Sequence, residues 1–240
     1  MYKLLFLFVS IFLIGCGSGD PSAVYLNKGI ARYDIKDYAG ALLYFDKSIE
    51  LKPKFNIAYA FRGFVKNFTK DYESAILDFN EAIKRPHEPS DKFIGSLFVG
   101  RATSKIELRN YKEALEDIKK SIELNPKDPT AYFLRGRINN ETMKYEEAKI
   151  DFDKALELFP DFIPVYLERG VVKYELSDYN GSISDLNKYI NVDSLSDRAY
   201  AYRGLSKFKL GDNDSGCSDI TKSIGLGNEV AVLLKTKFCN

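Results

Sequence analysis

The segment VYLERGVVK, residues 165–173, decides the fold because close copies of it recur along the chain. AYAFRGFVK begins at Ala58, AYFLRGRIN at Ala131 and AYAYRGLSK at Ala199. The last three copies start 34 residues apart, which indicates a repeat array. Taking the glycine of each copy, or the alanine in its place, as a reference gives six repeats at spacings of 34, 39, 34, 34 and 34 residues: Gly29, Gly63, Ala102, Gly136, Gly170 and Gly204.

Other positions keep their residue type relative to the reference. An aromatic residue stands four positions before it: Tyr25, Tyr59, Phe98, Tyr132, Tyr166 and Tyr200. A small residue stands twelve positions after it: Ala41, Ala75, Ala114, Ala148, Ser182 and Gly216. Small residues at both positions allow two antiparallel helices to approach closely, while aromatic and aliphatic side chains fill the layers between them.

This pattern resembles the tetratricopeptide repeat. The resemblance implies an all-α, right-handed superhelical solenoid in which the first helix of each hairpin lines a groove. It implies six repeats, at residues 22–55, 56–94, 95–128, 129–162, 163–196 and 197–230. Residues 231–240 are expected to form a capping helix, since terminal repeats need a different outer face.

The 39-residue spacing marks five extra residues around KRPHEPSDK, Lys84–Lys92. Pro86 and Pro89 stop the preceding helix, so a protruding loop is predicted. Two interpretations stay open: a contact specific to a partner, or a tolerated surface insertion.

The residue before the reference is basic in every repeat. An aspartate follows each arginine sixteen residues later, whereas Tyr44 follows Lys28. The constant spacing predicts a ladder of ion pairs, one inside each hairpin: Arg62 with Asp78, Arg101 with Asp117, Arg135 with Asp151, Arg169 with Asp185 and Arg203 with Asp219. We interpret the ladder as a device that fixes hairpin register; the alternative, an anion-binding strip, would be neutralised by the acids.

The first residues have the pattern of a targeting segment. Lys3 precedes an apolar run, Leu4–Ile14, that is too short to span a bilayer. Leu13–Cys16 also resembles the lipobox of bacterial lipoproteins, which implies cleavage of residues 1–15 and a diacylglycerol and an acyl chain on Cys16. Residues 16–21 would then be the lipidated cysteine and a tether. The alternative is an ordinary secretory signal with an incidental cysteine.

The charge balance and the residue types exclude several functions. Without residues 1–15 the chain would carry 34 basic and 34 acidic residues, and no basic stripe suggests nucleic-acid binding. His87 is the only histidine, and no phosphate-binding loop, nucleophile elbow or CxxC motif occurs. We therefore expect no catalytic residue, no metal site and no cofactor.

The resemblance places a largely apolar groove along the first helices and implies a protein or peptide partner. Our candidate groove residues are Tyr33, Phe61, Phe64, Phe68, Phe133, Arg137, Asn140, Tyr174 and Phe208. An equally open interpretation is that some of these rings pack between repeats.

Two cysteines remain once Cys16 is assigned to lipid. Cys217 and Cys239 lie roughly equidistant from the turn at residues 226–228, so an antiparallel hairpin would bring them together. An exported compartment permits oxidation, and a disulfide that pins the cap is predicted. Two separate thiols are the alternative.

Together these features predict a membrane-anchored adaptor of the bacterial cell envelope, with the outer membrane favoured over the inner. Similar lipoproteins serve as obligate subunits of envelope assembly machines, and others recruit cell-wall hydrolases. Both roles remain open beside general scaffolding.

Overall fold

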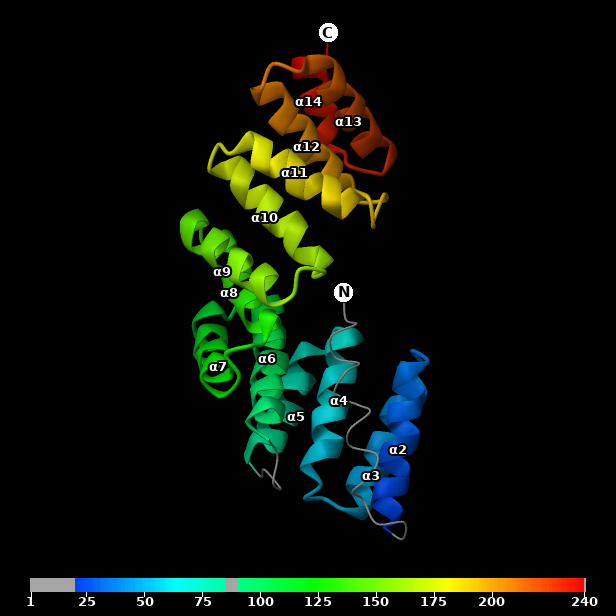
Figure 1. Ribbon diagram of the computed structural model, residues 1–240. Coiled ribbons are helices and arrows are strands. Elements are labelled where there is room, and N and C mark those ends of the chain that lie inside the picture. The colour runs from blue at the N-terminus through cyan, green and yellow to red at the C-terminus, as the bar shows by residue number, and fades with distance from the viewer. Residues whose placement is uncertain (1–19, 85–89, 240) are drawn as a thin grey trace. The chain divides into compact units, whose positions relative to one another are not determined.

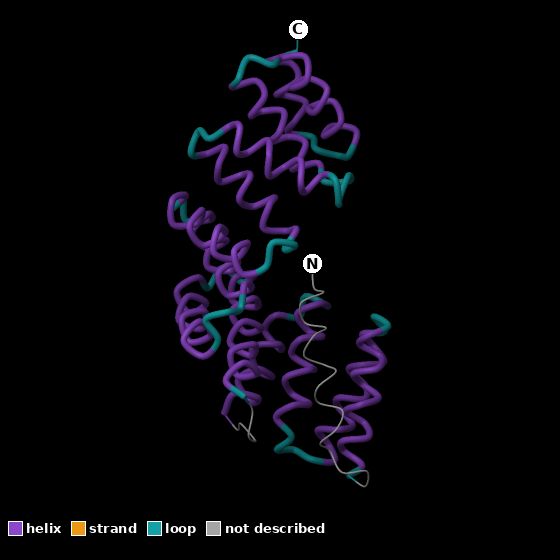
Figure 2. The backbone as a smooth tube through the Cα atoms, viewed as in Figure 1, coloured by secondary structure: helices purple, strands orange, loops and turns teal. Residues whose placement is uncertain are grey.

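The computed structural model describes residues 20–84 and 90–239. The predicted signal peptide, the predicted lipid site Cys16 and most of the predicted tether lie outside these residues. Within them the chain is all-α, with thirteen helices and no strand (Figures 1 and 2).

The helices form six consecutive hairpins and a final single helix, which confirms the predicted fold class. Their bounds are α2 Pro21–Asp34, α3 Tyr38–Leu51, α4 Asn56–Phe68, α5 Tyr72–Lys84, α6 Asp91–Glu107, α7 Tyr111–Leu124, α8 Pro129–Glu141, α9 Tyr145–Leu158, α10 Ile163–Glu175, α11 Tyr179–Ile190, α12 Asp197–Lys209, α13 Asn213–Gly225 and α14 Val230–Phe238. The chain divides into two compact units, residues 1–127 with α2–α7 and residues 128–240 with α8–α14. The repeat boundaries predicted within them stay a prediction.

The same tight turn joins the two helices of every hairpin. The residue seven positions after each reference has a left-handed backbone, with φ between 59° and 84°: Lys36, Lys70, Arg109, Met143, Ser177 and Gly211. The amide of the next residue donates to a carbonyl five residues back, as Asp178 N does to Lys173 O at 2.8 Å. This closure is of the Schellman type, so it satisfies a carbonyl at the end of the first helix. Because five of the six left-handed residues are not glycine, packing between the helices must offset a backbone cost of roughly 1 kcal/mol at each.

Close approach at the reference position builds the core of each hairpin. In the fourth hairpin, a Cβ added to Gly136 would lie 2.6 Å from Cε1 of Phe152, a ring of α9 that is fully buried. Large apolar side chains occupy the position of Phe152 in the other five hairpins: Phe45, Phe79, Ile118, Leu186 and Ile220. A glycine or alanine facing a bulky side chain is therefore the repeated packing unit.

The segment between the second and third hairpins is shorter than the predicted loop. Lys84 belongs to α5, and both Asp91 and Lys92 belong to α6. Ser90 caps α6 by accepting a hydrogen bond from the amide of Phe93 at 3.3 Å, so the helix begins at Asp91. Residues 85–89, including His87, lie outside the described residues.

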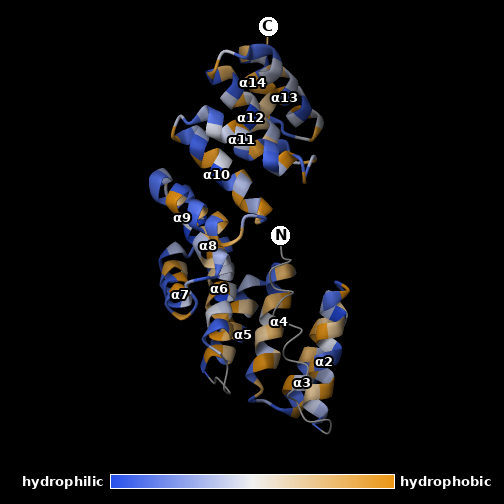
Figure 3. Ribbon diagram, viewed as in Figure 1, coloured by the Kyte–Doolittle hydropathy of each residue, from blue (hydrophilic) through white to orange (hydrophobic). Residues whose placement is uncertain are grey.

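Apolar and polar residues are interleaved along the helices (Figure 3). Such a pattern is expected for helices that bury one face against a neighbour and expose the other. Across residues 20–84 and 90–239, none of the helices has the length and apolar character needed to cross a bilayer.

The last two helices are joined covalently. Cys217 of α13 and Cys239, just after α14, form a disulfide with a Cα–Cα distance of 5.6 Å. Phe238 also stacks on Phe208 of α12, with ring centroids 4.8 Å apart. The cap is thus fastened to the sixth hairpin by a covalent bond and an aromatic contact.

Reduction of this disulfide is expected to loosen α14. The bridge closes a loop with a sequence separation of 22, for which the chain-entropy relation gives a stabilisation of about 3 kcal/mol. Hydrogen exchange in the presence of dithiothreitol should show faster exchange of the α14 amides, while α10 and α11 remain protected. A Cys217→Ser/Cys239→Ser variant should exchange quickly with or without reductant. Unchanged protection of α14 after full reduction would contradict this expectation.

Candidate functional site

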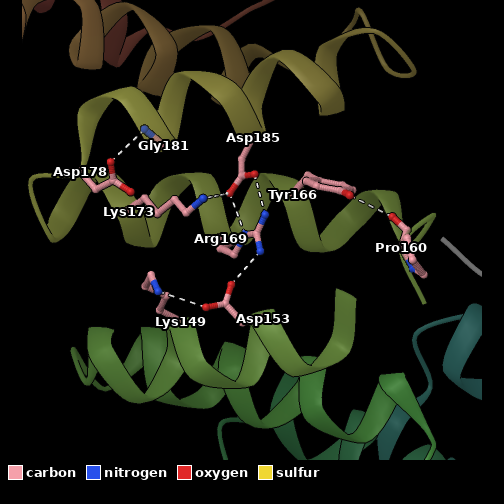
Figure 4. Close-up of polar contacts among 9 residues, drawn as sticks. All are labelled: Lys149, Asp153, Pro160, Tyr166, Arg169, Lys173, Asp178, Gly181 and Asp185. Carbon is pink, nitrogen blue, oxygen red and sulfur yellow. Dashed lines mark hydrogen bonds and ion pairs between the residues drawn. The ribbon is translucent and has the colours of Figure 1, made fainter. Parts of the chain in front are cut away.

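A network of ion pairs holds the first helix of five of the six hairpins, and the fifth hairpin shows its full geometry (Figure 4). Arg169 of α10 donates two parallel hydrogen bonds to Asp185 of α11, from Nε to Oδ2 and from Nη2 to Oδ1, both at 2.7 Å. Lys173 Nζ lies 2.8 Å from Oδ2 of the same carboxylate. The third guanidinium nitrogen, Nη1, donates at 2.7 Å to Asp153 of α9, in the preceding hairpin.

The structure brings together all five predicted Arg–Asp pairs. In each pair Nη2 donates to Oδ1 at 2.5–2.7 Å, and Nε donates to the same carboxylate: Arg62 with Asp78, Arg101 with Asp117, Arg135 with Asp151, Arg169 with Asp185 and Arg203 with Asp219. A lysine adds a second cation in four hairpins, whereas in the fourth the amide of Asn139 donates to Asp151 at 3.0 Å. The first hairpin has a different arrangement, in which Lys28 Nζ lies over the rings of Tyr25 and Tyr44.

The bonds between successive hairpins were not predicted. Four ladder arginines also donate through Nη1 to an oxygen on the second helix of the preceding hairpin: Asp46, Asn80, Asp153 and Asn187. In the sequence, each of these acceptors stands two positions after the ladder aspartate of its own repeat, or after Tyr44 in the first repeat. Lys119 stands at this position in the third hairpin.

Burial and pairing act in opposite directions on the pKa of Arg169. Burial acts to lower the pKa of the Arg169 guanidinium, but hydrogen bonds and charge from Asp185 and Asp153 outweigh it and raise that pKa above its usual value. The guanidinium therefore stays charged, and its donors are directed at protein oxygens. This geometry favours a structural role for the ladder over an anion-binding strip.

Three predicted groove residues belong to the core instead, so their assignment to an open groove is wrong. Tyr33, Phe64 and Phe133 have exposed fractions of 8%, 9% and 4%. Phe64 packs edge-on against Phe79 with centroids 5.0 Å apart, and Gly100 brings α6 close enough that a Cβ there would lie 2.8 Å from the Phe64 ring.

The other two buried rings are covered in a similar way. Phe133 contacts Phe162, which precedes α10, with centroids 5.1 Å apart, and Tyr33 contacts Phe68 at 5.6 Å. These rings pack between hairpins because each neighbouring hairpin supplies a side chain that covers them. For these three rings the structure supports the alternative interpretation, that they pack between repeats.

The remaining candidates are half-buried and lie on α4, α8, α10 and α12. Phe61 stacks on Phe45 of α3, Phe68 stacks on Tyr38, and Phe208 is stacked against Phe238. Each of these rings is thus partly covered by a neighbouring ring. Arg137 and Asn140 are half-buried on α8, and Tyr174 is half-buried on α10.

In the second unit a shallow pocket of about 190 Å³ opens between the first helices of the fourth, fifth and sixth hairpins. Its lining comes from α8, the turn that follows it, and the helices α9, α10 and α12: Asn140, Glu141, Met143, Tyr145, Val171, Glu175, Arg198 and Tyr202. Tyr174 stands beside it, edge-on to Tyr202 with centroids 5.5 Å apart. Of the predicted groove residues, Asn140 lines this pocket and Tyr174 supports its wall.

The cation in the pocket is already paired. Arg198 donates from Nη1 and Nη2 to the two carboxylate oxygens of Glu168, at 2.9 and 3.1 Å. Burial acts to lower the pKa of Arg198, but the charge of Glu168 outweighs it and raises that pKa. For the phenol of Tyr202, burial raises the pKa. The charge of Arg198 acts to lower that pKa, and the charge of Glu175 acts to raise it.

Most residues that line the pocket were not predicted from the sequence, although a recurring acidic residue indicates part of it. Glu141 and Glu175 stand five residues after their references, and Asp34 and Glu107 occupy the same position in the first and third repeats. An acid that recurs at the end of the first helix could have been recognised as a feature of the groove. Arg198 has no counterpart in the other repeats, and only Phe61 is also aromatic at the position of Tyr202, so no periodic signal revealed this pair.

A metal site finds no support in the part of the chain that the structure describes. Among these residues no three or more His, Cys, Asp or Glu side chains are grouped so that they could hold an ion. The acids of the ladder are instead spread singly, one to a hairpin.

Comparison with known proteins gives a consistent assignment of the repeats. Residues 22–55 and residues 99–161 each match a model of the tetratricopeptide repeat. No curated protein sequence matches the chain significantly.

Three solved structures have a similar fold. A chain of the APC/C hetero-tetramer Cut9-Hcn1 aligns with a TM-score of 0.80 at 17% identity over 91% of this chain, which spans 43% of that chain's length. PilF of Pseudomonas aeruginosa aligns at 0.77 and 16% identity, covering 90% of this chain and 96% of PilF. PilW, a type IV pilus biogenesis factor, aligns at 0.74 and 15% identity, covering 89% and 98%. The repeated hairpin geometry and the two family matches together show that the chain contains tetratricopeptide repeats.

Proposed function

We propose that the protein is a lipid-anchored, non-catalytic scaffold that binds protein partners at the surface of a bacterial envelope membrane. The observation that carries the binding role is the array of tetratricopeptide hairpins, an architecture that presents extended helical surfaces to other proteins. The resemblance of Leu13–Cys16 to a lipobox supports the anchor. Two or more acyl chains would hold the protein durably on a membrane.

A role as a subunit of an assembly machine is the second candidate. It is favoured by the likeness to PilW, a type IV pilus biogenesis factor. An obligate subunit should co-purify with its partners at fixed stoichiometry after detergent extraction. Weak, exchangeable partners would instead favour an adaptor, such as a recruiter of cell-wall hydrolases.

Replacement of Cys16 tests the anchor directly. Cells fed an alkyne-labelled fatty acid should incorporate the label into the wild-type protein and not into Cys16→Ser, because the thiol is the attachment point. The wild type should need detergent for extraction, whereas the variant should leave the membrane fraction or retain its uncleaved signal.

The other two cysteines supply the matched control for this labelling. The Cys217→Ser/Cys239→Ser variant should be labelled as strongly as the wild type, since it keeps Cys16 and changes only the other end of the array. Equal labelling of Cys16→Ser and the wild type would refute the lipid anchor.

A further inference from the structure

The pocket of the second unit combines three features that select one kind of ligand group. Its volume of about 190 Å³ is below the range typical of pockets for whole small molecules, so it suits a single side chain. Tyr145 and Tyr202 contribute aromatic rings to its lining. Glu141 and Glu175 contribute carboxylates from two different helices.

The charges around the pocket do not cancel. Glu168 neutralises Arg198 through two hydrogen bonds. Glu141 and Glu175 are exposed and make no ion pair with any residue that the structure describes. The pocket therefore has two unbalanced negative charges next to rings whose faces attract cations.

We propose that this pocket binds a lysine or arginine side chain of a partner polypeptide. The ammonium or guanidinium group would lie between the carboxylates of Glu141 and Glu175, and its alkyl stem would contact Val171 and Met143. The Arg198 guanidinium already lies 5.9 Å from the centroid of the Tyr202 ring, so Tyr145 would contribute the cation–π contact. This inference rests on the proposed role in protein binding and adds the chemistry of the partner: a basic segment rather than an acidic tail.

An acidic partner segment fits the same pocket poorly. The only cation in the lining, Arg198, already donates both terminal nitrogens to Glu168. A carboxylate entering the pocket would find the charge of Arg198 already neutralised by Glu168, and it would also meet Glu141 and Glu175 at close range. Both effects oppose binding of an acidic side chain.

Short peptides provide the test because they isolate one side chain. Saturation-transfer NMR on the detergent-extracted full chain would use acetyl-Gly-Ser-Xaa-Ser-Gly-amide, with Xaa as arginine, lysine, citrulline or glutamate. Arginine and lysine peptides should bind with saturation concentrated on the basic side chain. Citrulline keeps the shape of arginine without its charge and should bind at least about five-fold more weakly, and glutamate more weakly still.

Glutamine variants locate the binding. Glu141→Gln/Glu175→Gln should weaken the arginine peptide at least about five-fold, since two exposed ion pairs are lost. Glu157→Gln is the control: it makes the same Glu-to-Gln change once, at an exposed site on α9 that pairs with Lys154, twelve residues beyond Tyr145. Binding by this control should equal that of the wild type, and the unfolding midpoints of all three proteins should agree.

Three results would overturn the proposal: no binding of the arginine and lysine peptides, equal binding of the citrulline peptide, or undiminished binding by the double variant. These results are distinct from failure of the proposed function. A partner that co-purifies at fixed stoichiometry with a chain whose pocket ignores basic peptides would keep the scaffold role and reject this pocket.

Discussion

The Asp185→Ala variant should lose about 3–5 kcal/mol of unfolding free energy, because the substitution leaves two buried cations without their acceptor. The Asp185 side chain is 3% exposed, and it receives two hydrogen bonds from Arg169 and an ion pair from Lys173. The side chains of Arg169 and Lys173 are themselves only 15% and 14% exposed. Urea denaturation followed by far-UV circular dichroism would measure the loss.

The same arginine supplies the control. Asp153 accepts a hydrogen bond from Arg169 at 2.7 Å, but its side chain is 41% exposed and water can replace it. Asp153→Ala should therefore cost no more than about 1 kcal/mol. Equal losses for the two aspartates would mean that burial of the carboxylate adds nothing, and the register role of the ladder would lose its physical basis.

Phe152→Ala should be comparably severe, at about 3–5 kcal/mol, because it empties the centre of the fourth hairpin. The ring is fully buried and lies directly over Gly136, at a distance that leaves no room for a Cβ. Because that glycine also has no side chain, α8 cannot fill the cavity from its own side. Chemical denaturation would again report the loss, as a lower midpoint at unchanged denaturant dependence.

Ile150 is the matched control for this variant. It lies on the same helix, two residues before Phe152, with an exposed fraction of 66%. Ile150→Ala should change the unfolding free energy by no more than about 0.5 kcal/mol. A small effect of Phe152→Ala, similar to that of the control, would show that the hairpin tolerates an empty centre.

The hairpins and the ladder were predictable because both depend on spacing along one chain. The sixteen residues from Arg169 to Asp185 cover two helical segments and one tight turn, and that local geometry is the same in each repeat. A residue type that recurs at a fixed distance from a constant reference therefore indicates a contact inside the hairpin. The all-α fold follows from the same periodicity.

The candidate groove was less predictable because a position on a helix does not reveal what covers it. Phe64 and Phe133 stand on the expected face, yet Gly100 and Phe162 from following segments bury them. The pocket at Tyr202 depends in turn on side chains from three hairpins, and one of them, Arg198, has no counterpart in the other repeats. Such combinations are determined by tertiary packing, and a single repeat pattern does not encode them.

The bonds that reach back from one hairpin to the one before it also bear on how the gene for such an array can change. Arg203 finds its acceptor, Asn187, sixteen residues upstream, and Arg169 finds Asp153 at the same distance. Loss of the 34 residues 163–196 would place Asp153 sixteen residues before Arg203, in the register that Asn187 now holds. Loss of that one repeat would thus leave Arg203 with an acceptor, so removal of a whole hairpin at this place can shorten the array while the joint stays intact.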